Sequence, residues 1–145
     1  MLGNWIQEVS VVAPEDYDGF CDEPSLLRYE DVSSRERRSR ARDAMTSSFA
    51  GIEAERLYDP KAPDCHAKQD EENARWISRQ YEVLPPGCAY IGDEIYEEFL
   101  NWHRCEASRL VRQYSLEIRN VALALSERRS LSAEEVREII DATTL

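Results

Sequence analysis

The chain has 145 residues, with 18 Lys and Arg against 29 Asp and Glu, a formal net charge of −11 at pH 7 and 42% hydrophobic residues. This length predicts a single domain that buries about two-thirds of its unfolded surface, and the hydrophobic content excludes wholesale disorder. The acidic charge argues against nucleic-acid and anionic-membrane binders, because phosphate affinity requires a basic surface. No apolar run approaches the roughly 20 residues that span a bilayer, and the start lacks a signal peptide, so we expect a soluble cytoplasmic chain.

The first 32 residues predict a strand followed by an acidic loop. Residues 5–12 (WIQEVSVV) alternate apolar and polar side chains and are rich in β-branched residues, and Pro14 ends the run. The stretch that follows, EDYDGFCDEP, is turn-rich, and Gly19 suits a hairpin or loop.

Two helices are predicted next from apolar side chains at helical spacing. The first covers Ser33–Tyr58, opens with the capping box of Ser33 and Glu36 and is stopped by the prolines after it. The second covers about Asp70–Tyr81. Their inward-facing residues are expected to be Ala41, Met45, Phe49, Ile52 and Leu57 in the first helix and Ala74, Ile77 and Tyr81 in the second.

Two further helices complete the chain. The third and longest runs from about Asp93 to Ser126, and a short last helix opens at a second capping box, Ser132 with Glu135. Their inward-facing residues are expected to be Ile95, Phe99, Trp102, Ala107, Leu110, Val111, Tyr114, Ile118, Val121 and Leu125, followed by Val136, Ile139 and Ile140. The fold class is therefore mainly α: one domain over residues 1–145, with a small N-terminal β element and a helical bundle over residues 33–142.

Cysteine and histidine give weak signals for chemistry. The cysteines form no C-x-x-C pair, so we expect reduced thiols, and the adjacent Cys65 and His66 are better explained as loop residues than as a catalytic pair. The candidate ligands for a zinc centre are Cys65, His66, Cys88, His103 and Cys105, but no short chelating pair is present among them. His103 and Cys105 would point about 200° apart on a helix, which favours His103 as a helix-surface residue.

Three other features of the sequence stand out. Five arginines lie between positions 35 and 42, and they favour either a solvated face with ion pairs or a docking patch for an acidic partner. Gly51 in the middle of a helix costs about 1 kcal/mol relative to Ala. We therefore expect tight packing against Gly51 and Ala54, beside the carboxylate of Glu55. Asp70 suits the first turn of the second helix.

The order of these elements resembles the peptidase domain of FtsH-type ATP-dependent zinc proteases, from about Leu2 to Ile140. The segment I-Q-E-V-S-V-V-A-P resembles the strand that follows the zinc-binding helix of that family, and G-I-E-A-E at residues 51–55 resembles its G-x-x-A-E motif. Gln69-Asp70 with Ala74 resembles its N-D-x-x-x-A motif, and the tail N-V-A-L-A-L-S-E-R-R-S-L-S-A-E-E-V-R-E-I-I resembles its closing pattern. The resemblance implies a zinc metallopeptidase, with Asp70 as a metal ligand and Glu55 beside the ligands as an orienting group.

One departure from the family removes the expected catalysis. The chain holds two histidines, His66 and His103, and no H-E-x-x-H motif, so a site that needs three protein ligands lacks two of them. We therefore expect no catalytic residue, no zinc bound by this chain alone and no peptide hydrolysis. Either the native protein starts upstream with the zinc helix, or the chain is a degenerate relative that kept the scaffold.

Three hypotheses of function follow. The first is an FtsH-type peptidase-like domain, and the second is a non-catalytic helical protein-interaction module. The module would self-associate, or bind a partner over the Gly51 and Ala54 face, and the arginines at 35–42 could pair with the acidic loop 15–31 of another subunit in a salt-sensitive oligomer. The third is a metal-sensing or redox role for Cys65, His66 and Cys105.

Overall fold

The computed structural model is mostly helical and divides into two compact units. One unit comprises residues 29–113, and the other combines residues 1–28 with residues 114–145. A single domain over residues 1–145 stays a prediction. The structure describes residues 8–10, 20–22, 33–62, 64–85, 88 and 94–144, so the expected turn at Gly19 and the stops at Pro14 and Pro63 lie outside the described residues.

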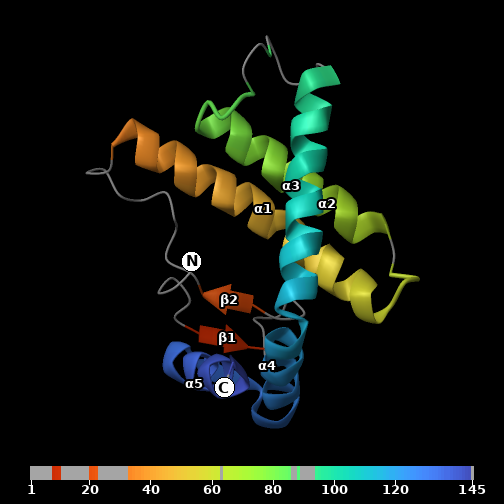
Figure 1. Ribbon diagram of the computed structural model, residues 1–145, viewed down its shortest axis with the longest axis vertical. Coiled ribbons are helices and arrows are strands. Elements are labelled where there is room, and N and C mark those ends of the chain that lie inside the picture. Colours follow the sequence, from red (N-terminus) through yellow and green to blue (C-terminus); the bar gives the residue numbers. More distant parts are fainter. Residues whose placement is uncertain are drawn as a thin grey trace. The chain divides into compact units, whose positions relative to one another are not determined.

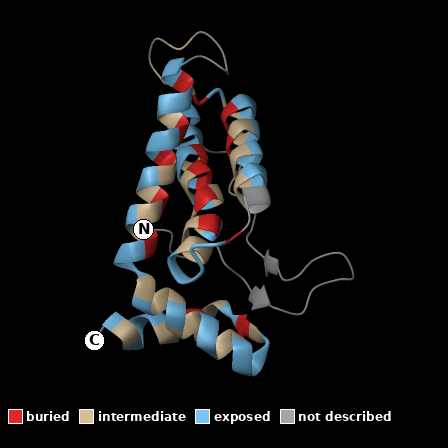
Figure 2. Ribbon diagram, turned by 90° about the vertical axis from the view of Figure 1, so that its right-hand side faces the viewer, coloured by how far each residue is buried: buried red, intermediate tan, exposed pale blue. Residues whose placement is uncertain are grey.

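Three helices build the unit of residues 29–113: α1 (Ser34–Tyr58), α2 (Asp64–Gln80) and α3 (Glu94–Gln113). α1 and α2 run antiparallel side by side, and α3 packs against α1 (Figure 1). Buried residues concentrate on the sides where these helices face one another (Figure 2). The core cluster comprises Ala41, Met45, Phe49, Ala74, Val83, Tyr96, Leu100 and Ala107.

α1 follows the sequence pattern closely. Ser33 caps it, and the Ser33 hydroxyl accepts a hydrogen bond of 3.3 Å from the backbone N–H of Glu36, as the capping box predicts. The Glu36 carboxylate accepts a 2.6 Å hydrogen bond from Arg40 one turn later. The expected apolar stripe is buried up to Ile52, whereas Leu57 is 38% exposed.

α3 buries only part of the expected line of residues. Ala107 and Val111 are buried as expected, whereas Ile95 and Trp102 are exposed. In the first half of the helix the buried residues lie one position further along the chain. Two neighbouring apolar stripes run along this helix, so the periodicity does not decide which of them faces the core. The buried line consists of Tyr96, Leu100, His103, Ala107 and Val111.

The predicted third helix is in fact two helices. Tyr114 leaves the helical conformation with φ −105° and ψ 24°, and α4 (Ser115–Arg128) begins after it. The apolar pattern continues across this break without a glycine or proline, so a single helix of about 34 residues was the wrong expectation. α4 ends at Arg129, which has a positive φ of 66° and whose N–H bonds the carbonyl of Leu125.

The second unit packs α4 against α5 (Ala133–Thr144). Asn120 of α4 donates a 2.9 Å hydrogen bond to the Thr143 hydroxyl of α5. The second capping box is complete, because the Glu135 N–H donates to the Ser132 hydroxyl at 3.3 Å and the Ser132 N–H donates to the Glu135 carboxylate at 2.8 Å. This pair of bonds confirms the expected start of the last helix.

Three strands of three residues each accompany these two helices: β1 (Glu8–Ser10), β2 (Phe20–Asp22) and β3 (Ser130–Ser132). They form an antiparallel sheet in the order β2-β1-β3, with Val9 opposite both Cys21 and Leu131. β1 lies within the residues 5–12 for which a strand is expected, whereas β3 carries no alternating pattern long enough to be recognised.

No helix among the described residues is both long and apolar enough to cross a membrane.

Candidate functional site

Asp70 does not open α2, contrary to the expectation from the sequence. α2 begins at Asp64, so Asp70 is its seventh residue, where its side chain is half-buried and engaged in an interaction. Residues 64–69 contain no glycine or proline, so nothing prevents the helix from starting there. An N-cap or first-turn role for Asp70 is therefore wrong, and its role as a metal ligand stays a prediction.

Gly51 lies on an exposed face of α1, where we expected tight packing. A Cβ built at Gly51 would meet nothing within 4 Å. The expected contact is therefore absent from the part of the chain that the structure describes. Glu55, one turn later, is half-buried and takes part in an interaction.

Small side chains surround Gly51 on the outer side of α1. Ser47, Gly51, Ala54 and Tyr58 recur at spacings of three and four residues, which places them on one side of the helix. Ser47 is exposed, Ala54 is half-buried and Tyr58 is 56% exposed. We call these four residues the Gly51 face.

His103 is a core residue, so the expectation of a helix-surface histidine is wrong. It is 1% exposed, and its Nδ1 shares a 2.8 Å hydrogen bond with Thr46 Oγ1. The rings of Phe99 and Trp102 lie edge-on to it at 4.7 and 4.9 Å. Burial, together with the positive charge of Arg42, lowers the pKa of His103 to about 4, so the imidazole is neutral at pH 7.

The residues considered for a zinc centre do not converge where they can be described. His103 points into the core, whereas Cys105 is exposed on the same helix, as their 200° separation predicts. Cys88 is half-buried and has an interaction of its own, and the side chains of Cys65 and His66 lie outside the described residues. Across residues 33–62, 67–85, 88 and 94–144, no group of three or more His, Cys, Asp or Glu could hold a metal ion.

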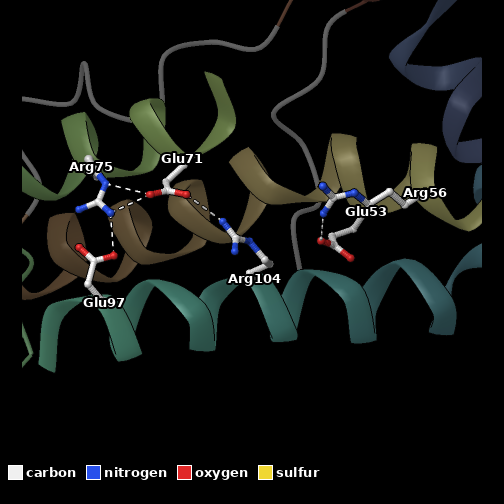
Figure 3. Close-up of polar contacts among 6 residues, drawn as sticks. All are labelled: Glu53, Arg56, Glu71, Arg75, Glu97 and Arg104. Carbon is white, nitrogen blue, oxygen red and sulfur yellow. Dashed lines mark hydrogen bonds and ion pairs between the residues drawn. The ribbon is translucent and has the colours of Figure 1, made fainter. Parts of the chain in front are cut away.

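An ion network between α2 and α3 is the strongest polar feature of the three-helix unit (Figure 3). Glu71 accepts hydrogen bonds from Arg75 at 2.7 Å and from Arg104 at 3.0 Å, and Arg75 also donates to Glu97 at 2.7 Å. The guanidinium of Arg104 lies 5.1 Å from the ring centre of Phe49, which connects the network to the core. The hydrogen bond from Arg75, supported by its charge and by Arg104, lowers the pKa of Glu71.

Sequence reasoning missed this network. The pair Glu71 and Arg75 has the i, i+4 spacing of a helical ion pair, so it could have been recognised. The bonds to Glu97 and Arg104 join residues 22 and 33 positions apart, and only the packing of α3 against the other helices brings them together.

The arginine segment at the start of α1 contains one side-chain ion pair between described residues, Arg40 with Glu36, and its other four arginines have no such pair. Arg35, Arg38 and Arg42 are exposed, and none has a carboxylate partner among the residues that the structure describes. Together with Ser34 and Ser39 they line an open hollow. Among the described residues, this arginine segment therefore has fewer ion pairs than the solvated face expected from the sequence.

Searches against models of known protein families and against curated proteins find no match for this chain. The resemblance to FtsH-type peptidase domains therefore stays a hypothesis that the sequence motifs alone support.

Proposed function

We propose that this chain is a non-catalytic helical scaffold that binds a helix of another protein along the Gly51 face of α1. The observation that supports this most is the open space at Gly51. A glycine inside a helix destabilises it by about 1 kcal/mol relative to alanine, and no described contact of this chain compensates for that cost. A backbone that approached α1 closely would require a residue without a Cβ at this position.

The shape of the face favours a helix as the bound element. Ser47, Gly51 and Ala54 have small side chains. The helical rise from Ser47 to Ala54 is about 10 Å, which is close to the length of two turns of a docked helix. Small residues let two helix axes approach at the short end of the usual 8–10 Å range. Tyr58, more than half exposed at one end of the face, provides an aromatic anchor of the kind enriched in binding sites.

The family resemblance supports the same face, because Gly51, Ala54 and Glu55 belong to the motif that resembles the G-x-x-A-E helix of FtsH-type peptidases. The described residues do not fit a zinc centre, because His103 is buried in the core and hydrogen-bonded to Thr46. We therefore derive no hydrolytic step for this chain and keep Asp70 and Glu55 as family-derived candidates only.

Photo-crosslinking in the native host tests the proposal. Benzoylphenylalanine at Ser47 should give one discrete adduct, identified by mass spectrometry, whereas the same probe at the exposed Glu98 of α3 should not. The variant Gly51→Leu should remove the Ser47 adduct, because a leucine side chain fills the face while suiting the helix itself. Glu72→Leu, which places the same side chain at an exposed site on α2, should keep the adduct.

Three outcomes contradict the proposal. They are the absence of an adduct at Ser47, an adduct with the mass of two copies of this chain, and an adduct that persists unchanged in Gly51→Leu.

A further inference from the structure

The arginine face of α1, defined as Ser34, Arg35, Arg38, Ser39 and Arg42, lies on a different side of the helix from the Gly51 face. Nine residues at 100° per residue place Arg42 half a turn around the helix from Gly51. The face combines three exposed guanidinium groups and two hydroxyls around an open hollow. It is therefore a second surface, independent of the proposed helix-binding face.

The positive charge of this face is not neutralised by the described residues. Glu36, the acidic residue next to Arg35, accepts its 2.6 Å hydrogen bond from Arg40. No described carboxylate pairs with Arg35, Arg38 or Arg42, although the chain as a whole carries a net charge of −11. Exposed arginines that have no carboxylate partner among the described residues are suited to carboxylates from outside, which they bind in short, charge-assisted hydrogen bonds.

An exposed tryptophan extends the face onto α3. Trp102 is 59% exposed, and its ring lies edge-on to His103 at 4.9 Å. Arg42 lies one helical turn before Thr46, whose hydroxyl is hydrogen-bonded to His103 at 2.8 Å. Arg42 on α1 and Trp102 on α3 therefore belong to the same contact between these two helices, where Trp102 supplies an exposed apolar ring.

We propose that the arginine face and Trp102 together bind an extended acidic peptide segment of another protein. Its carboxylates would pair with the arginines, and an apolar side chain beside them would cover Trp102. The helical rise separates Arg35 from Arg42 by about 10 Å along the axis. A peptide in the extended polyproline II conformation has three residues per turn and rises about 3.1 Å per residue. Two acidic residues in an E-x-x-E spacing then lie on one side, about 9 Å apart, and fit the two ends of the stripe.

Charge favours an acidic peptide over a nucleic acid. Three arginines neutralise few phosphates, and the remaining acidic surface repels a polyanion that extends beyond the face. A short peptide with two carboxylates fits within the stripe and meets the apolar ring of Trp102.

Fluorescence anisotropy with a defined probe tests the proposal on the full chain. The probe is a fluorescein-labelled 12-residue peptide that carries E-x-x-E flanked by leucines, and its Glu→Gln version is the control. Arg38→Glu should weaken binding of the acidic peptide by about tenfold, because it places a like charge at the centre of the stripe. Arg37→Glu is the matched control, because it makes the same change of charge at the neighbouring exposed residue, which lies on another side of the helix. It should weaken binding by less than about twofold.

A pair of tryptophan variants tests the apolar part of the face. Trp102→Ala should weaken binding by about fivefold, whereas Trp76→Ala, which removes a tryptophan of similar exposure from α2, should leave it unchanged. Far-UV circular dichroism confirms that each variant is folded. Four results would overturn the proposal. The first two are equal weakening of binding by Arg37→Glu and Arg38→Glu, and equal binding of the acidic peptide and its Glu→Gln version. The other two are Arg38-dependent binding of a single-stranded oligonucleotide but not of the peptide, and an Arg38-dependent dimer of this chain in sedimentation at low salt.

Discussion

Thr46 of α1 and His103 of α3 are joined by a 2.8 Å hydrogen bond between Oγ1 and Nδ1, in a core that leaves His103 1% exposed. The other ring nitrogen, Nε2, is buried without a hydrogen-bond partner among the described residues. The neutral imidazole therefore suits this position, and a protonated one would place an uncompensated charge in the core.

His103 should make the stability of the protein depend on pH. Its pKa of about 4 in the folded state lies below the 6.5 of an unperturbed histidine, so the unfolded chain binds the proton first as the pH falls. The free energy of unfolding should be highest above pH 6.5 and should fall by up to about 3 kcal/mol as the pH drops to 4. Urea unfolding followed by circular dichroism at pH 7.5 and 4.5 measures this change.

The double variant Thr46→Val with His103→Leu removes both polar partners together and should flatten the pH dependence. His66→Gln removes the other histidine of the chain and should leave that dependence as it is. A wild-type profile that stays level between pH 7.5 and 4.5, or one that is flattened equally by His66→Gln, contradicts this account.

Glu71 should be the most sensitive carboxylate in the three-helix unit. Glu71→Gln weakens the hydrogen bond from Arg75 within α2 and the bond from Arg104, which joins α2 to α3. We expect a loss of about 1 kcal/mol in the free energy of unfolding. Glu72→Gln at the exposed neighbouring position should change it by less than about 0.5 kcal/mol. A double-mutant cycle of Glu71→Gln with Arg104→Gln isolates the bridging bond, and a coupling energy of zero would show that the bridge contributes nothing.

Local patterns predict the starts of the first and last helices of this chain well, because caps are encoded by neighbouring residues. The hydroxyl–amide bond at Ser33 and both bonds at Ser132 form as the capping boxes indicate. The buried line through Leu100 and His103 depends on packing between helices. No glycine or proline in the sequence marks the break between α3 and α4 at Tyr114. Both faces of α3 carry apolar residues, so hydrophobic periodicity does not decide which face of the helix is buried. Contacts with the other helices decide it.

For the candidate sites, too, the local sequence does not show which residues are buried and which are exposed. The arginine segment and Gly51 are visible in the sequence, but the exposure of both is a property of the folded unit. The expectation of a packed Gly51 assumed that a helix keeps glycine where another backbone approaches closely, and among the described residues the structure shows open space instead.

Gly51→Ala should stabilise the isolated protein. The added Cβ meets no described atom within 4 Å, and alanine is the better helix former by about 1 kcal/mol. Thermal unfolding should therefore give a higher midpoint for Gly51→Ala than for the wild type. A lower midpoint would mean that another part of the chain already occupies the Gly51 face, which would also count against the proposed helix-binding function.

Purified protein should retain no stoichiometric zinc. The only histidine side chain that the structure describes is His103, whose Nδ1 is bonded to Thr46, and the sequence holds no H-E-x-x-H. Inductively coupled plasma mass spectrometry after dialysis against a mild chelator measures the metal content. Asp70→Asn should give the same low content as the wild type, whereas one zinc per chain that is lost in Asp70→Asn would establish Asp70 as a ligand.

Arg129 at the end of α4 should be a site where glycine stabilises the protein. Its φ of 66° lies in the left-handed region, which costs a residue with a Cβ roughly 1 kcal/mol, and glycine is the usual residue at this position after a helix. Arg129→Gly should raise the free energy of unfolding by about 0.5–1 kcal/mol, which is the strain relieved minus the greater freedom of glycine in the unfolded chain. Arg119→Gly, at an exposed position inside α4, should lower it by about 1 kcal/mol. Urea unfolding of the two variants separates these effects, and a loss of stability in both would mean that the interaction made by the Arg129 side chain outweighs its backbone strain.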